Sequence, residues 1–323
     1  MPAPLSGDPA EVAVLAGEVP ISLGMTTAPV ALGSGMLFAN RVNGHLVFTE
    51  PADQAGDWPI KWRRRPGEHT LALLGAGELA IAATLDRTLV AYDADGRWRW
   101  QSTTDDLVAQ LALLDEQSFI TLGLDGTLSV RSLTDGTQLQ HSQVASGASL
   151  PMAVDDRRIA VAAGRMLSIV HPDGQVHNQA LAAGIGGLAW VDGQLVVVDH
   201  EATLSVFDPG GERAWQLGLP DTCLTTLSLD GMLVCASSTT IRAISISERQ
   251  VTWQQPIAAL GVAEVAGQLL VTGRQHSWLL DADGTQLAQW QAARASSQHW
   301  VVPLESGLLV ISPDGNTDWW AAP

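Results

Sequence analysis

Five acidic and histidine side chains in predicted turns could do acid–base or metal chemistry if the fold brought them together: Asp86, Asp199, His200, Glu201 and His276. Carboxylates and imidazoles transfer protons and bind divalent metals. The eight His residues, however, include no His-Glu-x-x-His pair, and the chain has neither a Gly-x-Ser-x-Gly elbow nor a Walker loop. The sequence therefore predicts no enzyme, no catalytic residues, no metal and no cofactor. An enzyme or small-ligand site around these five residues, at the mouth of a central channel, stays open as the alternative.

The strongest basic cluster is the run from Trp62 to Arg65, in a chain with 34 acidic and only 17 basic side chains. Arg forms paired hydrogen bonds with carboxylates, so clustered Arg favours an acidic partner. Turns expected at the same end of the strands carry further Arg, and Trp58 falls in the longest irregular insertion, where we expect it to be partly exposed. We predict that another protein, through an acidic segment, binds at Arg41, Trp58, Arg63, Arg64, Arg65, Arg87, Arg165, Arg274 and Arg294. Ordinary polar turn chemistry is the alternative reading of these residues.

Composition restricts the partners and the location. The formal net charge of −17 repels phosphate backbones and anionic membranes, so nucleic acid and membrane insertion are not expected. The N-terminus lacks a basic segment followed by an apolar run, and no lipidation Cys follows it, which predicts a cytoplasmic location. Cys223 and Cys235 are predicted to stay reduced, because a hairpin turn at Asp230-Gly231 places Cys235 opposite Thr226 and leaves Cys223 beyond it.

Short alternating strands, each ended by Gly or Asp-Gly, fill the chain, and helical periodicity is almost absent. The segment TLVAYDADGRWRW, from Thr88 to Trp100, recurs in variants that begin at Thr127, Met166, Thr203, Thr240 and Ser277. Each copy follows another hairpin, so one unit holds four strands, A to D. Eight inner-hairpin turns, spaced 36 to 42 residues apart, predict an all-β, eight-bladed β-propeller in a single domain, 1–323, with seven blades as the alternative.

The two ends of the chain complement each other. The last unit provides strands A, B and C and then stops, whereas residues Glu11 to Leu15 form an isolated apolar segment. We expect the N-terminal segment, 1–16, to supply strand D of the last blade and so to close the fold.

The copies LVAYDADGRWRWQ, LSVFDPGGERAWQ and WLLDADGTQLAQW resemble the repeat of the PQQ-like (pyrroloquinoline-quinone-type) propeller family. The resemblance implies that Trp62, Trp100, Trp215, Trp253 and Trp290 wedge between blades, with Gln140 and Asn178 near that place in two other units. Quinone-dependent dehydrogenases of the family hold quinone and calcium at an acidic site that cannot be located here. The chain is closer to the non-catalytic branch, and similar in architecture only to an eight-bladed outer-membrane assembly lipoprotein. That branch implies a protein-interaction scaffold within a larger bacterial assembly.

Overall fold

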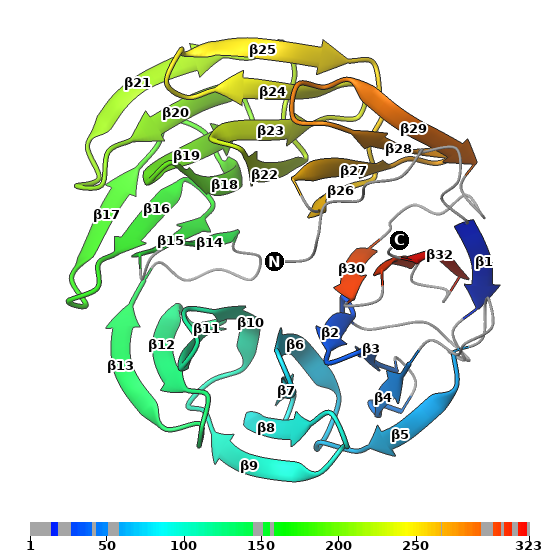
Figure 1. Ribbon diagram of the computed structural model, residues 1–323. Coiled ribbons are helices and arrows are strands. Elements are labelled where there is room, and N and C mark those ends of the chain that lie inside the picture. The colour runs from blue at the N-terminus through cyan, green and yellow to red at the C-terminus, as the bar shows by residue number, and fades with distance from the viewer. Residues whose placement is uncertain are drawn as a thin grey trace. The chain divides into compact units, whose positions relative to one another are not determined.

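The computed structural model describes residues 14–18, 27–40, 43–50, 58–144, 151–155, 158–265, 267–291, 300–304, 307–311 and 316–321. In these residues 32 strands form eight sheets of four strands each (Figure 1). The predicted all-β class and four-stranded blades are confirmed, and the sheets number eight, not seven. None of the described residues forms a helix that is long and apolar enough to cross a membrane.

The chain divides into two compact units, residues 1–141 with 293–323 and residues 142–292. The single domain over 1–323 stays a prediction. In the first unit, the inner strands of blades 8, 1, 2 and 3 contact one another in that order. Its strands are, for blade 1, β2 (Val30–Leu32), β3 (Gly35–Ala39), β4 (Leu46–Thr49) and β5 (Ile60–Arg64); for blade 2, β6 (Thr70–Ala76), β7 (Leu79–Thr84), β8 (Thr88–Asp93) and β9 (Trp98–Thr103); for blade 3, β10 (Val108–Leu113), β11 (Ser118–Gly123), β12 (Thr127–Ser132) and β13 (Gln138–Gln143); and for blade 8, β30 (Trp300–Leu304), β31 (Gly307–Ile311), β32 (Asn316–Ala321) and β1 (Val14–Glu18).

The second unit contains blades 4 to 7, whose inner strands also contact one another in sequence order. Its strands are, for blade 4, β14 (Met152–Asp155), β15 (Arg158–Ala163), β16 (Met166–Val170) and β17 (Val176–Ala180); for blade 5, β18 (Ile185–Val191), β19 (Gln194–Asp199), β20 (Thr203–Phe207) and β21 (Arg213–Gly218); for blade 6, β22 (Thr225–Leu229), β23 (Met232–Ala236), β24 (Ile241–Ser245) and β25 (Gln250–Gln255); and for blade 7, β26 (Gly261–Val265), β27 (Gln268–Thr272), β28 (His276–Leu280) and β29 (Gln286–Gln291).

Blade 8 is completed by the N-terminal strand. β1 pairs antiparallel with β32 through five residue pairs, from Val14 opposite Trp320 to Glu18 opposite Asn316, and lies beside it in Figure 1. The expected closing strand is therefore present, although it begins three residues later than the predicted Glu11. Joining the two ends of the chain in one sheet leaves β32 with a hydrogen-bonded neighbour on both sides.

Neighbouring blades are joined by one outer-strand side chain that reaches the C–D turn of the next blade. The indole Nε1 donates to a turn carbonyl oxygen in three cases: Trp62 to Ala94 at 2.7 Å, Trp100 to Leu133 at 2.9 Å and Trp253 to Ala282 at 2.9 Å. Each indole lies against the Gly of that turn, so closely that a Cβ on Gly96, Gly136 or Gly284 would come within 2.5–2.7 Å of a ring carbon. These glycines are needed both for their positive φ and for the space that the indole takes.

Two junctions in the second unit vary this contact. His177 takes the Trp place in blade 4, opposite Ile169, and packs on Gly211; Asn178, expected near that place, is the next residue. Trp215 meets Arg249, which replaces the turn Gly at φ 59° and holds its guanidinium 5.9 Å from the indole centroid.

Trp290 is out of register with the other four tryptophans. In blade 7 the strand register places Ala288 where blades 1, 2, 5 and 6 have Trp, and Trp290 lies two residues further along, opposite Ser277. In blade 8 strands C and D are β32 and β1, so the place of a C–D turn falls to residues beyond Ala321 and before Val14, which lie outside the described residues. The wedge role predicted for Trp290 stays a prediction.

Trp58 is buried, contrary to the predicted exposure. It is 4% exposed and belongs to a cluster with Met36, Phe38, Val302 and Leu309, between blades 8 and 1. The indole lies in the core just before β5, so the expected exposure of Trp58 is wrong.

We expect Gly136→Ala to destabilise the protein more than Gly77→Ala. Both glycines have positive φ, so both substitutions carry a backbone cost of about 1–2 kcal/mol. Only at Gly136 would the new Cβ meet Trp100, at 2.6 Å, whereas nothing lies within 4 Å at Gly77. Urea unfolding should show an additional loss of about 1–3 kcal/mol for Gly136→Ala, the usual cost of overpacking. Equal losses would contradict the docking role of the indole.

Deleting residues 1–18 should lower the melting temperature, because it removes β1 and exposes the edge of β32. Deleting only residues 1–12 keeps the whole strand and is the matched control. Differential scanning calorimetry of both variants measures the difference. If the two deletions melt at the same temperature, β1 does not stabilise blade 8.

Candidate functional site

The two aspartates of the alternative site each accept hydrogen bonds within their own turn. Asp199 Oδ1 accepts the backbone N–H groups of Glu201 at 3.0 Å and Thr203 at 2.8 Å. Asp86 accepts a hydrogen bond from the Thr84 hydroxyl. These are Asx-type and hydroxyl–carboxylate contacts that close turns.

The two imidazoles lie in different blades. His200 packs against Gly184 and Gly186 in blade 5, whereas His276 lies 6.0 Å from the ring of Trp278 in blade 7. Asp86 belongs to the first unit and the other four residues to the second. Among the described residues, no group of three or more His, Cys, Asp or Glu side chains is arranged to hold a metal ion.

In the first unit, the D–A connections and B–C turns of successive blades lie side by side. Leu85 N–H donates to His69 O at 2.8 Å, and Arg87 Nη1 donates to Asp105 O at 3.3 Å. Further along, Leu124 N–H donates to Leu107 O at 3.0 Å. These contacts form one continuous surface, the loop surface, which consists of Arg65, Gly67, Leu85–Arg87, Thr104–Leu107 and Leu124–Gly126.

The loop surface combines exposed leucines with charges of both signs. Leu85 and Leu124 occupy the same turn position in blades 2 and 3 and are 42% and 36% exposed. Arg65 and Arg87 are exposed beside them, but so are the carboxylates of Asp86 and Asp125. The predicted Arg-bearing face is therefore mixed in charge over these blades.

The other residues predicted to bind a partner are distributed over both units. Arg63 and Arg64 are exposed on β5, and Arg165 and Arg274 are exposed in turns of blades 4 and 7. Arg165 Nη1 donates to Ala182 O at 3.4 Å. Arg41 and Arg294 lie outside the described residues.

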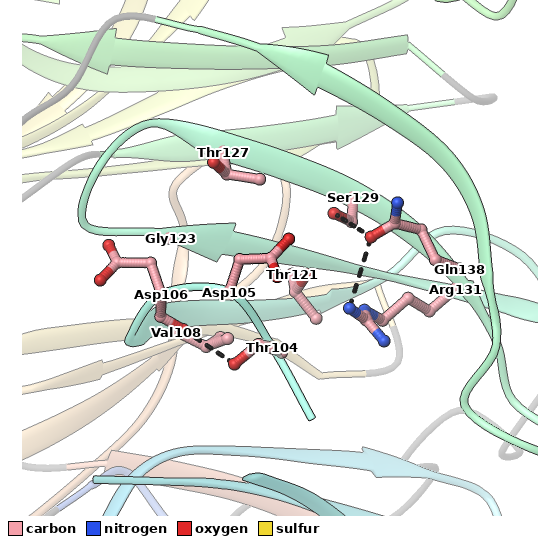
Figure 2. A pocket seen from close by; sticks show the side chains of 10 residues that line it. All are labelled: Thr104, Asp105, Asp106, Val108, Thr121, Gly123, Thr127, Ser129, Arg131 and Gln138. Atoms are coloured by element: carbon pink, nitrogen blue, oxygen red, sulfur yellow. Dashed lines mark hydrogen bonds between the residues drawn. The ribbon is translucent and has the colours of Figure 1, made fainter. Parts of the chain in front are cut away.

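A small polar cavity lies beneath the loop surface (Figure 2). Its volume is about 20 Å³, and its lining includes Thr104, Asp105, Thr121, Ser129 and Arg131. Such a cavity holds about one water molecule, which is too little for an organic ligand.

Arg131 is the buried charge at this cavity. Its Nη1 donates to Gly136 O at 3.1 Å and to Ser102 Oγ at 3.3 Å, and its Nη2 donates to Gln138 Oε1 at 3.4 Å. Burial lowers the pKa of Arg131, and the nearby Asp105 carboxylate opposes that effect. Arg131 therefore links the outer strands of blades 2 and 3, and its role is structural.

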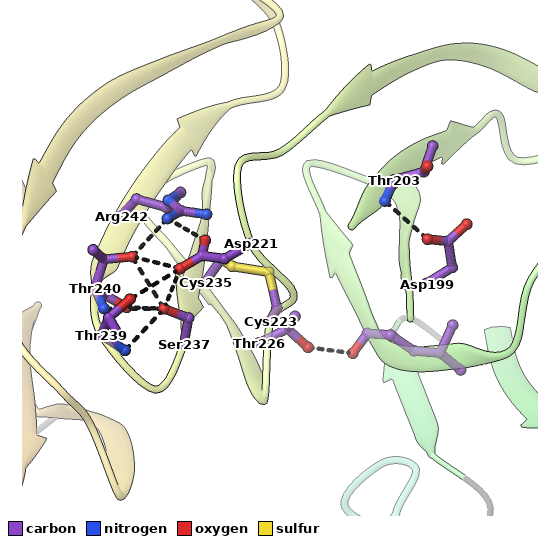
Figure 3. Close-up of a disulfide and its surroundings, with 11 residues drawn as sticks. Asp199, Thr203, Asp221, Cys223, Thr226, Cys235, Ser237, Thr239, Thr240 and Arg242 are labelled. Atoms are coloured by element: carbon purple, nitrogen blue, oxygen red, sulfur yellow. Dashed lines mark hydrogen bonds and ion pairs between the residues drawn. A yellow bond between two sulfur atoms is a disulfide. The ribbon is translucent and has the colours of Figure 1, made fainter. Parts of the chain in front are cut away.

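A second buried charge lies in blade 6 (Figure 3). Arg242 is 1% exposed and forms an ion pair with Asp221, which comes from the D–A connection before the blade. The Asp221 carboxylate also accepts hydrogen bonds from Ser237 at 2.6 Å and Thr240 at 3.2 Å. Burial alone would raise the pKa of Asp221, but these hydrogen bonds and the Arg242 charge outweigh it and lower the pKa. Asp221 therefore stays ionised beside Arg242.

The same connection carries a disulfide between Cys223 and Cys235, whose Cα atoms are 5.4 Å apart. The expectation of two reduced thiols is wrong. Cys235 does lie opposite Thr226, as the hairpin turn predicts, but the chain before Thr225 folds back over β23 and brings Cys223 to it. The disulfide and the ion pair together fasten this connection to blade 6.

Sequence reasoning missed both buried arginines, although the repeats contain the signal. At the position of Arg242, the C strands of blades 1 to 5 and 7 have Val47, Val90, Ser129, Ser168, Ser205 and Trp278, and that of blade 8 has Asp318. At the position of Arg131 they have mostly apolar residues, such as Tyr92 and Phe207. A charged residue at a repeat position that holds mostly small or apolar residues in the other blades predicts a buried group that is paired.

The sequence matches, over residues 16–217, the family described as outer membrane protein assembly factor BamB. No curated protein sequence matches the chain.

Solved structures with the same fold include BamB from Moraxella catarrhalis, with 17% identity and a TM-score of 0.69 over 95% of this chain and 100% of that one. The computationally designed Ika8 protein has 14% identity and a TM-score of 0.73 over 94% of this chain and 100% of that one. At this level of identity the two structures establish the β-propeller fold.

Asp221→Ala should destabilise the protein by about 3 kcal/mol, because it leaves the Arg242 guanidinium buried without its counter-charge. Arg242→Ser introduces the residue that blades 3, 4 and 5 have at this position. The double variant Asp221→Ala/Arg242→Ser should therefore be more stable than Asp221→Ala alone. Urea unfolding of both variants measures this, and a double variant as unstable as the sum of the singles would contradict the pairing.

The contribution of Asp221 should also depend on pH. Because its pKa is lowered in the folded protein, its stabilisation is fully present above the unfolded value, about 3.9, and is lost as pH falls through the folded pKa. The difference in unfolding free energy between wild type and Asp221→Asn should thus be constant near neutrality and shrink below about pH 4.

Proposed function

Because the chain belongs to the family of the outer membrane protein assembly factor BamB, we propose that it is a non-catalytic scaffold that binds another protein within a larger bacterial assembly. The fold supports this role, since repeated blades present many turns on a rigid frame. A scaffold needs an exposed surface with anchoring side chains and no catalytic constellation.

This proposal rests on the loop surface. Leu85 and Leu124 expose apolar area at equivalent positions of adjacent blades, with Arg87 between them and Arg65 beside them. Apolar anchors ringed by charged side chains are the usual composition of a protein-binding patch. Because the same turns also carry carboxylates, the partner must present both acidic and basic side chains to the loop surface.

The enzyme alternative receives no support from the described geometry. Asp86 and Asp199 satisfy turn donors, and His200 and His276 pack in different blades. The small cavity at Arg131 has room for about one water. The non-catalytic role is therefore the proposal that the site residues favour.

The cytoplasmic location stays a prediction, and the disulfide weighs against it. Cytoplasmic thiols are kept reduced in most bacteria, whereas disulfides persist in oxidising compartments. The Cys223–Cys235 disulfide supports an oxidising compartment as the place where the protein works.

Replacing both exposed leucines by aspartate should remove partner binding. The tagged full-length protein captures its partner from a lysate of the source organism, and the captured protein is then purified and titrated. We expect the Leu85→Asp/Leu124→Asp variant to bind it at least about tenfold more weakly than wild type, as for loss of interface anchors.

The matched control is Leu139→Asp/Val251→Asp, which makes the same change at two exposed apolar residues on the outer strands β13 and β25. This control should bind as wild type does. If both double variants bind the partner equally well, the loop surface is not the binding site.

A further inference from the structure

The basic side chains of the first unit are concentrated on two neighbouring outer strands. Of the 17 basic residues in the chain, six lie in or next to β5 and β9: Lys61, Arg63, Arg64, Arg65, Arg97 and Arg99. The outer strands β13, β25 and β29 carry mostly Gln, Thr and apolar residues instead, with no Lys or Arg. A positive patch on a chain of net charge −17 is a local feature that composition does not account for.

Side-chain contacts join the two strands into one surface. Trp62 of β5 docks on Ala94 in the turn before β9, and Arg64 Nε donates to Gly96 O at 2.7 Å in the same turn. Arg97 and Trp98 follow that turn directly. We name this surface the basic edge and define it by Lys61, Arg63, Arg64, Arg97, Trp98 and Arg99.

Trp98 is the exposed aromatic residue of the basic edge. It is 60% exposed, although Trp100, two residues on, is 6% exposed and docked between blades. Trp98 lies opposite Tyr92 in the strand register and takes no docking role. Trp and Arg are the residues most enriched among interface hot spots.

The charges of the basic edge lie at the surface, including Lys61, which pairs with Glu50 at 3.1 Å. The Arg63 side chain makes no hydrogen bond or ion pair within the described part of the chain. Arg97 pairs with Asp95 at 2.8 Å and Arg99 with Asp93 at 3.6 Å, with the two guanidinium side chains 75% and 59% exposed. Exposed pairs of this kind are weak, so a carboxylate from outside can replace the internal one at little cost.

Strand addition does not suit this edge. The register shows an extra residue, Lys61 in β5 and Arg99 in β9, at a bulge just before the docked Trp. Bulges and outward charges prevent regular pairing of another strand along an edge. A partner must therefore bind through side chains.

We propose that the basic edge is a second interaction surface, which binds an acidic segment of a partner protein through the Arg guanidinium groups, with Trp98 as an apolar anchor. Charge complementarity argues for this occupant. A second copy of the chain would be repelled by the overall charge of −17. The proposal rests on the scaffold function and adds a surface separate from Leu85 and Leu124.

A fluorescent peptide of about twelve residues that alternates Glu with Leu or Phe tests the proposal by anisotropy. Wild type should bind it at low salt and more weakly at raised salt. Arg97→Glu/Arg99→Glu should weaken binding about tenfold or more. Trp98→Ala should weaken it by several fold at an unchanged melting temperature, because the ring is exposed.

Arg213→Glu is the matched control, since Arg213 is exposed on the outer strand β21 and lies outside the basic edge. It should bind the peptide as wild type does. Equal weakening by Arg213→Glu, equal binding of a peptide with Gln in place of Glu, or no binding at low salt would overturn the proposal. Binding to phosphatidylglycerol vesicles without binding to the acidic peptide would assign the edge to a membrane and overturn it as well.

The experiments on the loop surface and on the basic edge can fail independently of each other. Loss of partner capture in Leu85→Asp/Leu124→Asp with no peptide binding by wild type would leave the scaffold function standing and remove the basic edge. Peptide binding by wild type, with partner capture unaffected by the leucine changes, would retain the basic edge and move the main partner site away from the loop surface.

Discussion

The contact on which the blades depend is that between an outer-strand side chain and the C–D turn of the next blade. Trp62, Trp100 and Trp253 each donate a hydrogen bond to a turn carbonyl and cover the Gly of the same turn. A four-stranded sheet cannot bury both of its faces alone, so its stability comes from such junctions. The contact also explains why Asp-Gly recurs: the Gly provides the positive φ of the turn and leaves the space that the indole occupies.

The residues at a junction between blades can change if the outer-strand side chain still packs against the C–D turn of the next blade. His177 replaces Trp and still packs on Gly211, whereas Arg249 replaces Gly and lies over Trp215. Larger departures appear as buried charges. Arg131 and Arg242 stand in columns of small or apolar residues, and each recruits partners from an adjacent strand or connection, such as Ser102 and Asp221. Pairing is required because an isolated buried guanidinium would cost several kcal/mol.

Strand period, turn chemistry and repeat spacing were sufficient to predict eight four-stranded blades and a closing N-terminal strand, because these depend on neighbours along the chain. What failed depends on contacts between distant segments. Trp58 was expected at the surface, since nothing in the local sequence shows that its side chain packs in one cluster with Met36. The Cys223–Cys235 disulfide depends on the path of an irregular connection, and strand register alone cannot give that path. The strand register also places His177, the residue before Asn178, at the Trp position of blade 4, and it places Trp290 two residues beyond that position in blade 7.

Partner binding on such a fold is limited by the way the outer edges are protected. The bulges that direct Trp62 and Trp100 into the junctions leave Lys61 and Arg99 pointing outward. Each bulge therefore contributes to the packing between blades and also places a positive charge on the outer strand. In blades 5, 6 and 7 the extra residue is neutral: Ala214, Thr252 and Leu287. Blades 1 and 2 differ in having cations there, with an exposed Trp98 beside them. Where a bulge is present, the extra residue points away from the junction, so its identity can change to suit a partner while the docking of the indole is kept.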